Sequence, residues 1–126
     1  MVSPLQAIEN PSHFKDGTLH SNGDEKHIAN RTSISFYLSE EKDYMYLNQA
    51  KQGSATITDK NLYLIDSERL ECLTIPHIQV KSMNYVKPWF ATNHLEVLVK
   101  DGKILKIHFD AEMHKSFLAL YSSVAK

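Results

Sequence analysis

Apolar and polar residues alternate along most of the chain after Ser33, which is the pattern of half-buried β-strands. We interpret the alternating segments as strands over residues 33–38, 44–50, 54–58, 61–66, 72–76, 77–86, 94–100 and 103–109. A helix from Ser39 to Gly53 is the alternative for the second segment, because Ser39 could cap such a helix and Gly53 could end it. The pattern as a whole predicts about seven strands.

Two short interruptions predict tight turns between neighbouring strands. In "GSATITDKNLYLID" (residues 53–66), the polar residues 59–61 separate two alternating runs. Asp101-Gly102 separates "HLEVLVK" from "KILKIHF", and Asp-Gly favours a primed turn because both central residues of that turn need a positive φ. Each interruption therefore predicts a hairpin.

The apolar period changes from two to that of a helix at Asp110. The apolar residues that follow form one stripe of an amphipathic helix: Met113, Phe117, Leu120, Tyr121 and Val124. Asp110 is a good N-cap residue, so we expect the helix to begin there. His114 falls one position off the stripe, which predicts a surface position for it.

Residues 1–32 show no regular period, because Pro4, Pro11, Gly17 and Gly23 interrupt every run. We expect an irregular N-terminal arm, with one short helix at residues 4–9, that packs on the domain or stays mobile. Residues 33–126 would then form one domain, in line with a length of 126 residues.

Composition is that of an ordinary globular protein, with 42% hydrophobic and 23% charged residues. The formal net charge of −1 gives no general attraction to nucleic acid, which we do not expect as a partner. No apolar run is long enough to cross a bilayer, and the first residues lack the pattern of a secretory signal. We therefore expect a cytoplasmic protein that could also lie at the membrane surface. The single cysteine, Cys72, lies in an apolar run and is expected to be buried and unreactive.

Four stretches in order resemble the bacterial pleckstrin-homology-like and GRAM domains: "GSATITDKNLYLID", "LTIPHIQVKSM", "LEVLVKDGKILKIHF" and residues 110–126. The likeness covers about residues 36–126. It implies a mainly β fold, in which a bent antiparallel sheet, or partly open barrel, of about seven strands is capped by one C-terminal amphipathic helix. The chain departs from that family in its long N-terminal arm and in Asn61, where a basic residue is commoner.

No catalytic motif accompanies this pattern, and we expect no catalytic residue, no metal ligand and no cofactor. His13, His20 and His27 recur every seven residues, but Pro and Gly interrupt the arm that carries them, so they do not share a helix face. The acidic pairs Asp24-Glu25 and Glu40-Glu41 lie in polar connections and are expected to be solvated. A small metal-dependent or hydrolytic enzyme, using His77 or His108, is the least favoured function.

Binding is better supported by the sequence. "YVKPWF" (residues 85–90) places three aromatic rings around a proline, and Trp89 either folds back into the core or lies in an exposed loop. The candidate contact residues are Lys51, Lys60, Lys87, Trp89 and Phe90. The lysines, with Lys81, are either solvated or ring one mouth of the sheet. The function that we expect is an interaction or assembly module that binds a protein partner or copies of itself through a sheet edge; the alternative is peripheral binding to anionic lipid through the Lys-flanked aromatic loop.

Overall fold

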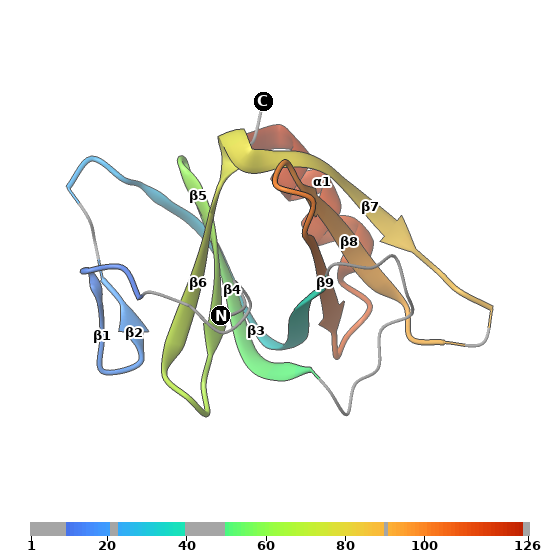
Figure 1. Ribbon diagram of the computed structural model, residues 1–126, viewed down its shortest axis with the longest axis horizontal. Helices are drawn as coiled ribbons and strands as arrows, with labels where there is room; N and C mark the ends of the chain where they lie inside the picture. The colour runs from blue at the N-terminus through green and yellow to red at the C-terminus, as the bar shows by residue number, and fades with distance from the viewer. Residues whose placement is uncertain (1–9, 21–22, 40–49, 90, 125–126) are drawn as a thin grey trace.

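A computed structural model describes residues 10–20, 23–39, 50–89 and 91–124. Within them, seven antiparallel strands form one sheet in the order β6-β5-β4-β3-β9-β8-β7, followed by helix α1 (Figure 1). The strands are β3 (His27–Ser39), β4 (Lys51–Thr58), β5 (Asn61–Asp66), β6 (Glu71–Pro76), β7 (Val80–Val86), β8 (His94–Val99) and β9 (Ile104–Phe109). The predicted mainly β fold with a terminal helix is confirmed.

The sheet curls because β3 is bent in the middle. Its first half pairs with β4, its second half also pairs with β9 from Ile34 onward, and the register shifts between Arg31 and Ile34. Ser33 has a φ of 56° at this bend. At the opposite corner, the 3-10 turn η2 (His77–Gln79) follows Pro76 and redirects the chain from β6 into β7. The result is a half-barrel whose two terminal strands, β6 and β7, are joined at one corner.

The core fills the inside of the half-barrel and follows the predicted alternation. Leu62, Leu64, Val97, Leu105 and Ile107 are fully buried in one cluster with the inner face of α1. The turn between β4 and β5 comprises Asp59 and Lys60, as predicted, and β5 covers the predicted residues 61–66.

Gly53 in β4 lies where no side chain fits. A Cβ atom there would lie 1.6 Å from the backbone oxygen of Ile65 on the neighbouring strand. The close approach of the two backbones therefore requires glycine at this position. Since β4 begins at Lys51, the alternative helix from Ser39 to Gly53 does not extend to Gly53. Residues 40–49, where a strand or that helix was predicted, lie outside the described residues.

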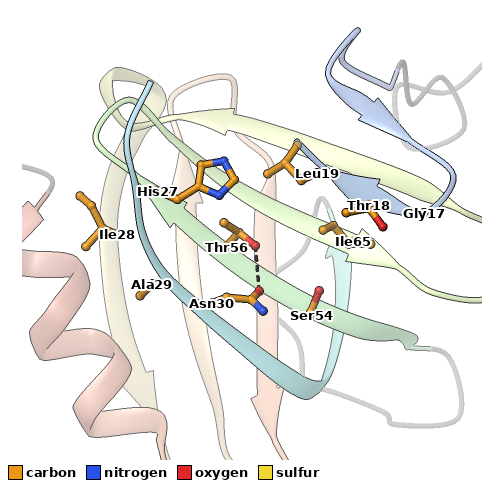
Figure 2. A pocket seen from close by; sticks show the side chains of 10 residues that line it. All are labelled: Gly17, Thr18, Leu19, His27, Ile28, Ala29, Asn30, Ser54, Thr56 and Ile65. Carbon is orange, nitrogen blue, oxygen red and sulfur yellow. Dashed lines mark hydrogen bonds between the residues drawn. The ribbon is translucent and has the colours of Figure 1, made fainter. Parts of the chain in front are cut away.

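The N-terminal segment is more regular than predicted. Strands β1 (Phe14–Lys15) and β2 (Thr18–Leu19) form a hairpin whose turn residues, Asp16 and Gly17, have φ values of 55° and 75°. This hairpin lies over the outer face of the main sheet (Figure 2). Residues 27–32, which we expected in the irregular arm, belong to β3.

The hairpin buries a second, smaller core on the outer face. Phe14 packs there with Tyr63, Ile65 and Cys72, and Leu19 lies beside them. Strand β5 is consequently buried on both faces, which explains why its sequence is apolar at nearly every position rather than alternating. The predicted burial of Cys72 is confirmed.

Helix α1 (His114–Val124) begins later than predicted from Asp110. The backbone N–H of Asp110 donates to Ser33 O at 3.2 Å, so this residue still extends the sheet. His114 is buried rather than exposed, because its Nε2 accepts a 3.2 Å hydrogen bond from the backbone N–H of Phe109. Phe117 and Tyr121 on the predicted stripe are buried, while the other three stripe residues are partly buried. The described part of the chain contains no helix long and apolar enough to span a membrane.

Candidate functional site

The loop between β7 and β8 carries the most exposed aromatic side chain of the described residues. Trp89 is 95% exposed, so the interpretation of this residue as part of the core is wrong. Lys87 is exposed two residues earlier, at the end of β7. At the other end of β7, Ile78 in η2 is 73% exposed. The two ends of β7 are therefore marked by large apolar side chains in contact with water.

The two terminal strands of the sheet differ in how their outer edges are occupied. On β6, the backbone N–H of Cys72 donates to Asn10 Oδ1 at 2.8 Å, and Asn10 Nδ2 donates to Leu70 O at 3.2 Å. Pro76, the last residue of β6, has no N–H to offer. Strand β7 pairs with β8 on one side, and no described strand pairs with its other side. Among the described residues, β7 therefore has the outer edge to which no side chain is bonded, and we call it the free edge.

Histidines hold the base of the β7–β8 loop. Nδ1 of His94 donates to Thr92 O at 2.9 Å, and Nδ1 of His108 donates to Asn93 O at 2.8 Å. His94 is 1% exposed, and burial lowers its pKa. Burial also lowers the pKa of His114, whose ring lies 5.3 Å from that of His108. His108, which the alternation in its strand predicts to be solvated or to contact a neighbouring strand, is half-buried and bonded to a loop carbonyl.

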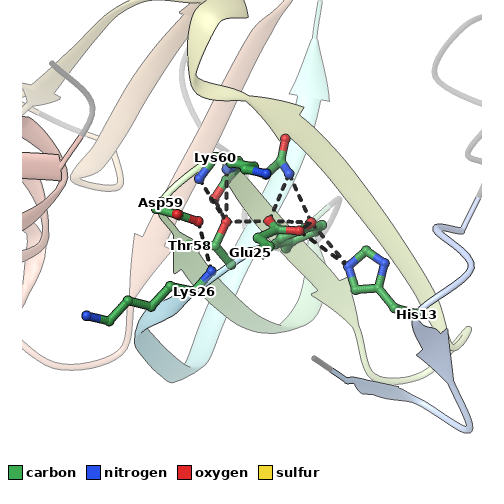
Figure 3. Close-up of polar contacts among 8 residues, drawn as sticks. His13, Glu25, Lys26, Thr58, Asp59 and Lys60 are labelled. Carbon is green, nitrogen blue, oxygen red and sulfur yellow. Dashed lines mark hydrogen bonds and ion pairs between the residues drawn. The ribbon is translucent and has the colours of Figure 1, made fainter. Parts of the chain in front are cut away.

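A buried carboxylate, Glu25, ties the N-terminal segment to the sheet (Figure 3). Its Oε2 accepts hydrogen bonds from the Thr58 hydroxyl and, at 2.8 Å, from Asn61 Nδ2. The Tyr63 hydroxyl lies 2.6 Å from Oε2 and 2.8 Å from Oε1. His13 Nε2 lies 3.9 Å from Oε1, on the open side of the group. The prediction that Glu25 is solvated is therefore wrong, since the residue is 6% exposed.

This network explains residues that sequence reasoning treated as turn chemistry alone. Asp59 Oδ1 accepts the backbone N–H of Lys26 at 2.9 Å, which fastens the segment next to Glu25 to the β4–β5 turn. Asn61, the departure from the family pattern, is a donor to Glu25. Burial, and then the hydrogen bond to Glu25, raise the pKa of Tyr63. The signal in the sequence was the closely spaced hydroxyl and amide side chains of Thr58, Asn61 and Tyr63, all of which bind Glu25.

Two residues of types that often act in catalysis, Cys72 and His77, have structural surroundings. Burial raises the pKa of the Cys72 thiol to about 12, which leaves little thiolate at neutral pH. His77 donates from Nε2 to Thr58 O at 2.7 Å and accepts at Nδ1 from the Tyr121 hydroxyl at 2.9 Å, so it fastens α1 to the sheet. Among the described residues, no cluster of His, Cys, Asp or Glu has the arrangement of a metal site.

The candidate lysines do not gather at one place. Lys51 begins β4 and lies 3.8 Å from Glu71, whereas Lys60 lies in the turn at the other end of β4, on the order of 25 Å away for a strand of this length. Lys87 follows the last residue of β7. Phe90 lies outside the described residues. Of the candidate contacts, the structure brings together Lys87 and Trp89 in one loop.

A cavity of about 370 Å³ lies at the seam where β6 approaches the β8–β9 turn. Leu73, Ile75 and Val99 supply much of its apolar wall. Lys103 at its rim lies 2.8 Å from Asp101, so its charge is already paired. The seam therefore offers a largely apolar hollow without an unpaired cation among the described residues that line it.

Comparisons with known proteins identify the fold. No protein-family model and no curated protein matches the chain. Among solved structures, the Vps36 N-terminal PH domain matches with a TM-score of 0.70 and 18% identity, over 94% of this chain and 89% of that one. A chain of the 8S snRNP assembly intermediate matches with a TM-score of 0.61 and 12% identity, over the same shares. The chain therefore has a pleckstrin-homology-like fold.

Proposed function

We propose that this protein is a non-catalytic interaction module that binds an extended segment of a protein partner, or of a second copy of itself, along the free edge of β7. The observation that carries the proposal is the 95% exposure of Trp89 beside that edge. Tryptophan is enriched among the residues that dominate binding energy, so an exposed tryptophan beside an open strand edge is well placed to anchor a partner.

The ends of β7 support an extended partner in particular. A strand that pairs with β7 would run between Ile78 and Trp89, so that backbone hydrogen bonds would form along the edge and apolar contacts at both ends. On the corresponding edge of β6, Asn10 already occupies the Cys72 N–H and the carbonyl of Leu70. Backbone pairing supplies affinity in this mode of recognition, and the two apolar side chains would set the register.

Selection of displayed peptides on the full chain tests the proposal directly. Peptides that bind should lose at least about tenfold in affinity for Trp89→Ala and for Ile78→Ala, since each truncation removes a contact worth about 1.4 kcal/mol or more. Leu70→Ala is the matched control, because Leu70 is also an exposed apolar residue but lies in the β5–β6 turn. Light scattering over a range of concentrations tests self-association with the same three variants. Peptides bound equally well by all variants would refute the site.

Peripheral binding to anionic lipid is the second candidate, favoured by the exposed Lys87 two residues from Trp89. A tryptophan ring is favourable at a membrane interface, and a nearby lysine is attracted to anionic lipid. Flotation with vesicles that contain phosphatidylserine should then show binding that weakens with salt and is lost in Trp89→Ala and Lys87→Ala. Vesicle binding without peptide binding would favour this second function over the first.

A further inference from the structure

A cavity of about 440 Å³ lies outside the half-barrel, between the β1–β2 hairpin and the outer face of β3 and β4 (Figure 2). Its volume falls within the range of pockets that hold small molecules, roughly 300–1,000 Å³. It is separate from the proposed β7 surface, because β3 and β4 lie at the middle of the sheet and β7 at one end. Its lining residues are Gly17, Thr18, Leu19, His27, Ile28, Ala29, Asn30, Ser54, Thr56 and Ile65.

Polar groups from three strands converge on this cavity. The Thr56 hydroxyl donates to Asn30 Oδ1 at 2.9 Å, which fixes the orientation of the amide. Nδ2 donates to none of the described residues, so its two N–H groups are offered to a ligand. The hydroxyls of Ser54 on β4 and Thr18 on β2 line the same space and can each donate and accept. The ring of His27 adds a further polar edge.

The lining carries no Lys, Arg, Asp or Glu side chain among the described residues. A charged ligand would therefore lose hydration without gaining a partner of opposite charge. One wall is apolar, because Leu19 from the hairpin and Ile65 from β5 face the cavity. The cavity thus pairs hydroxyl and amide groups with an apolar wall, which suits a ligand that has hydroxyl groups at its edge and a C–H face.

We propose that this cavity binds a neutral, polyhydroxylated ring compound, that is, a carbohydrate of one or two sugar units. Sugar hydroxyls act as both donors and acceptors, as do those of Ser54 and Thr18. The C–H face of the ring would lie against Leu19 and Ile65. A ligand of this size in an open cavity is expected to dissociate with a constant on the order of 1 mM.

Nuclear magnetic resonance titration of the full chain tests the proposal, with maltose and N-acetylglucosamine as probes. The backbone amides of residues 17–19, 28–30 and 54–56 should shift in a saturable way. Thr56→Val should weaken binding about 3- to 10-fold, because it removes one hydrogen bond and releases the Asn30 amide. Thr32→Val, the same change at an exposed position of β3 outside the cavity, should leave the affinity within about twofold.

Two further compounds test alternatives to recognition of a neutral sugar. Glucose 6-phosphate tests recognition of charge, and 1,6-hexanediol tests simple apolar binding. Both should bind more weakly than maltose at the same amides. Tighter binding of the phosphate, no saturable shift with either sugar at concentrations up to about 50 times the expected constant, or equal affinity of Thr56→Val and the natural chain would each overturn the proposal. Because these readouts involve neither Trp89 nor Ile78, they are independent of the peptide-binding experiment.

Discussion

Replacing Tyr63 by Phe removes one hydroxyl from the buried network and changes nothing else in the side chain. That hydroxyl lies 2.6 Å and 2.8 Å from the two carboxylate oxygens of Glu25. It also accepts from Asn61 Nδ2 at 3.0 Å. The ring itself stays packed against Phe14 in the second core. The substitution therefore measures the hydrogen bonds alone.

The fall in the free energy of unfolding that Tyr63→Phe causes can be estimated from these contacts. A hydrogen bond to a charged group contributes about 1.5–3 kcal/mol, and a buried polar group left without its partner costs about 1–3 kcal/mol. Glu25 keeps its hydrogen bonds from Thr58 and Asn61, so its carboxylate loses only part of its hydrogen bonding. We expect the free energy of unfolding to fall by about 3 kcal/mol. With a denaturant slope of about 1.5 kcal/mol per molar urea, the midpoint should fall by about 2 M.

Urea unfolding at pH 7.5, followed by circular dichroism, provides the measurement. Tyr85→Phe is the matched control, because no hydrogen bond of the Tyr85 hydroxyl joins it to the described part of the chain and its ring stacks on His114 in either form. The control should change the free energy of unfolding by less than about 0.5 kcal/mol. A Tyr63→Phe midpoint indistinguishable from that of the control, at an unchanged slope, would show that Glu25 does not depend on this hydroxyl.

Three further predictions concern stability. Gly53→Ala should cost about 3 kcal/mol or more and reduce the yield of folded protein, because its Cβ would clash with the Ile65 backbone; the urea midpoint measures this loss. Phe14→Ala should cost about 3–5 kcal/mol, through loss of the side chain that anchors the hairpin, and calorimetry should show a lower melting temperature; an unaltered value would mean that the hairpin contributes no stability. Burial lowers the pKa of His94 and His114 below 6.5 in the folded protein, so the contribution of the two neutral rings to the free energy of unfolding is fully present above pH 6.5. This contribution is lost as the pH falls through their lower folded-state pKa values. Urea unfolding at pH 7.5, 6.5 and 5.5 should show the decline, and the double variant His94→Gln with His114→Gln should show a smaller one.

The main sheet could be predicted from the sequence because its strands are short and their apolar residues alternate. The hairpin around Asp101-Gly102 and the turn at Asp59-Lys60 are local features. The predicted primed turn is wrong, because residues 100–103 connect β8 to β9 and, of the two central residues, Gly102 alone has a positive φ, 96°. The burial of Cys72 followed from its apolar neighbours. These features depend on residues near one another in the chain, which is the range over which sequence patterns are informative.

The positions of Glu25 and His114 could not be predicted, because their partners are distant in the chain or belong to the backbone. Glu25 contacts Tyr63, which is 38 residues later in the chain, and the residues around position 25 do not predict a buried carboxylate. His114 is buried by a bond to a backbone N–H in β9, which no side-chain pattern records. The observed start of α1 differs from the predicted one for a similar reason, since Asp110 is hydrogen-bonded to Ser33 on a distant strand.

Trp89 raised a different difficulty, because an aromatic residue in a loop is compatible with either a core or a surface position. The bounds of the loop, residues 87–93, were predicted, but the alternating pattern that shows which side chains are buried ends at Val86 and gives no direction for Trp89. Its role in binding, like those of the candidate lysines, stays a prediction.

The amide of Asn10 that covers the edge of β6 has a consequence for assembly. A sheet that can pair at both ends adds copies without limit and grows into fibres. Here Asn10 occupies the Cys72 N–H and the Leu70 carbonyl at one end, which disfavours pairing there, so copies that join through β7 would leave only ends that pair poorly. Such an association would stop at a two-fold symmetric pair.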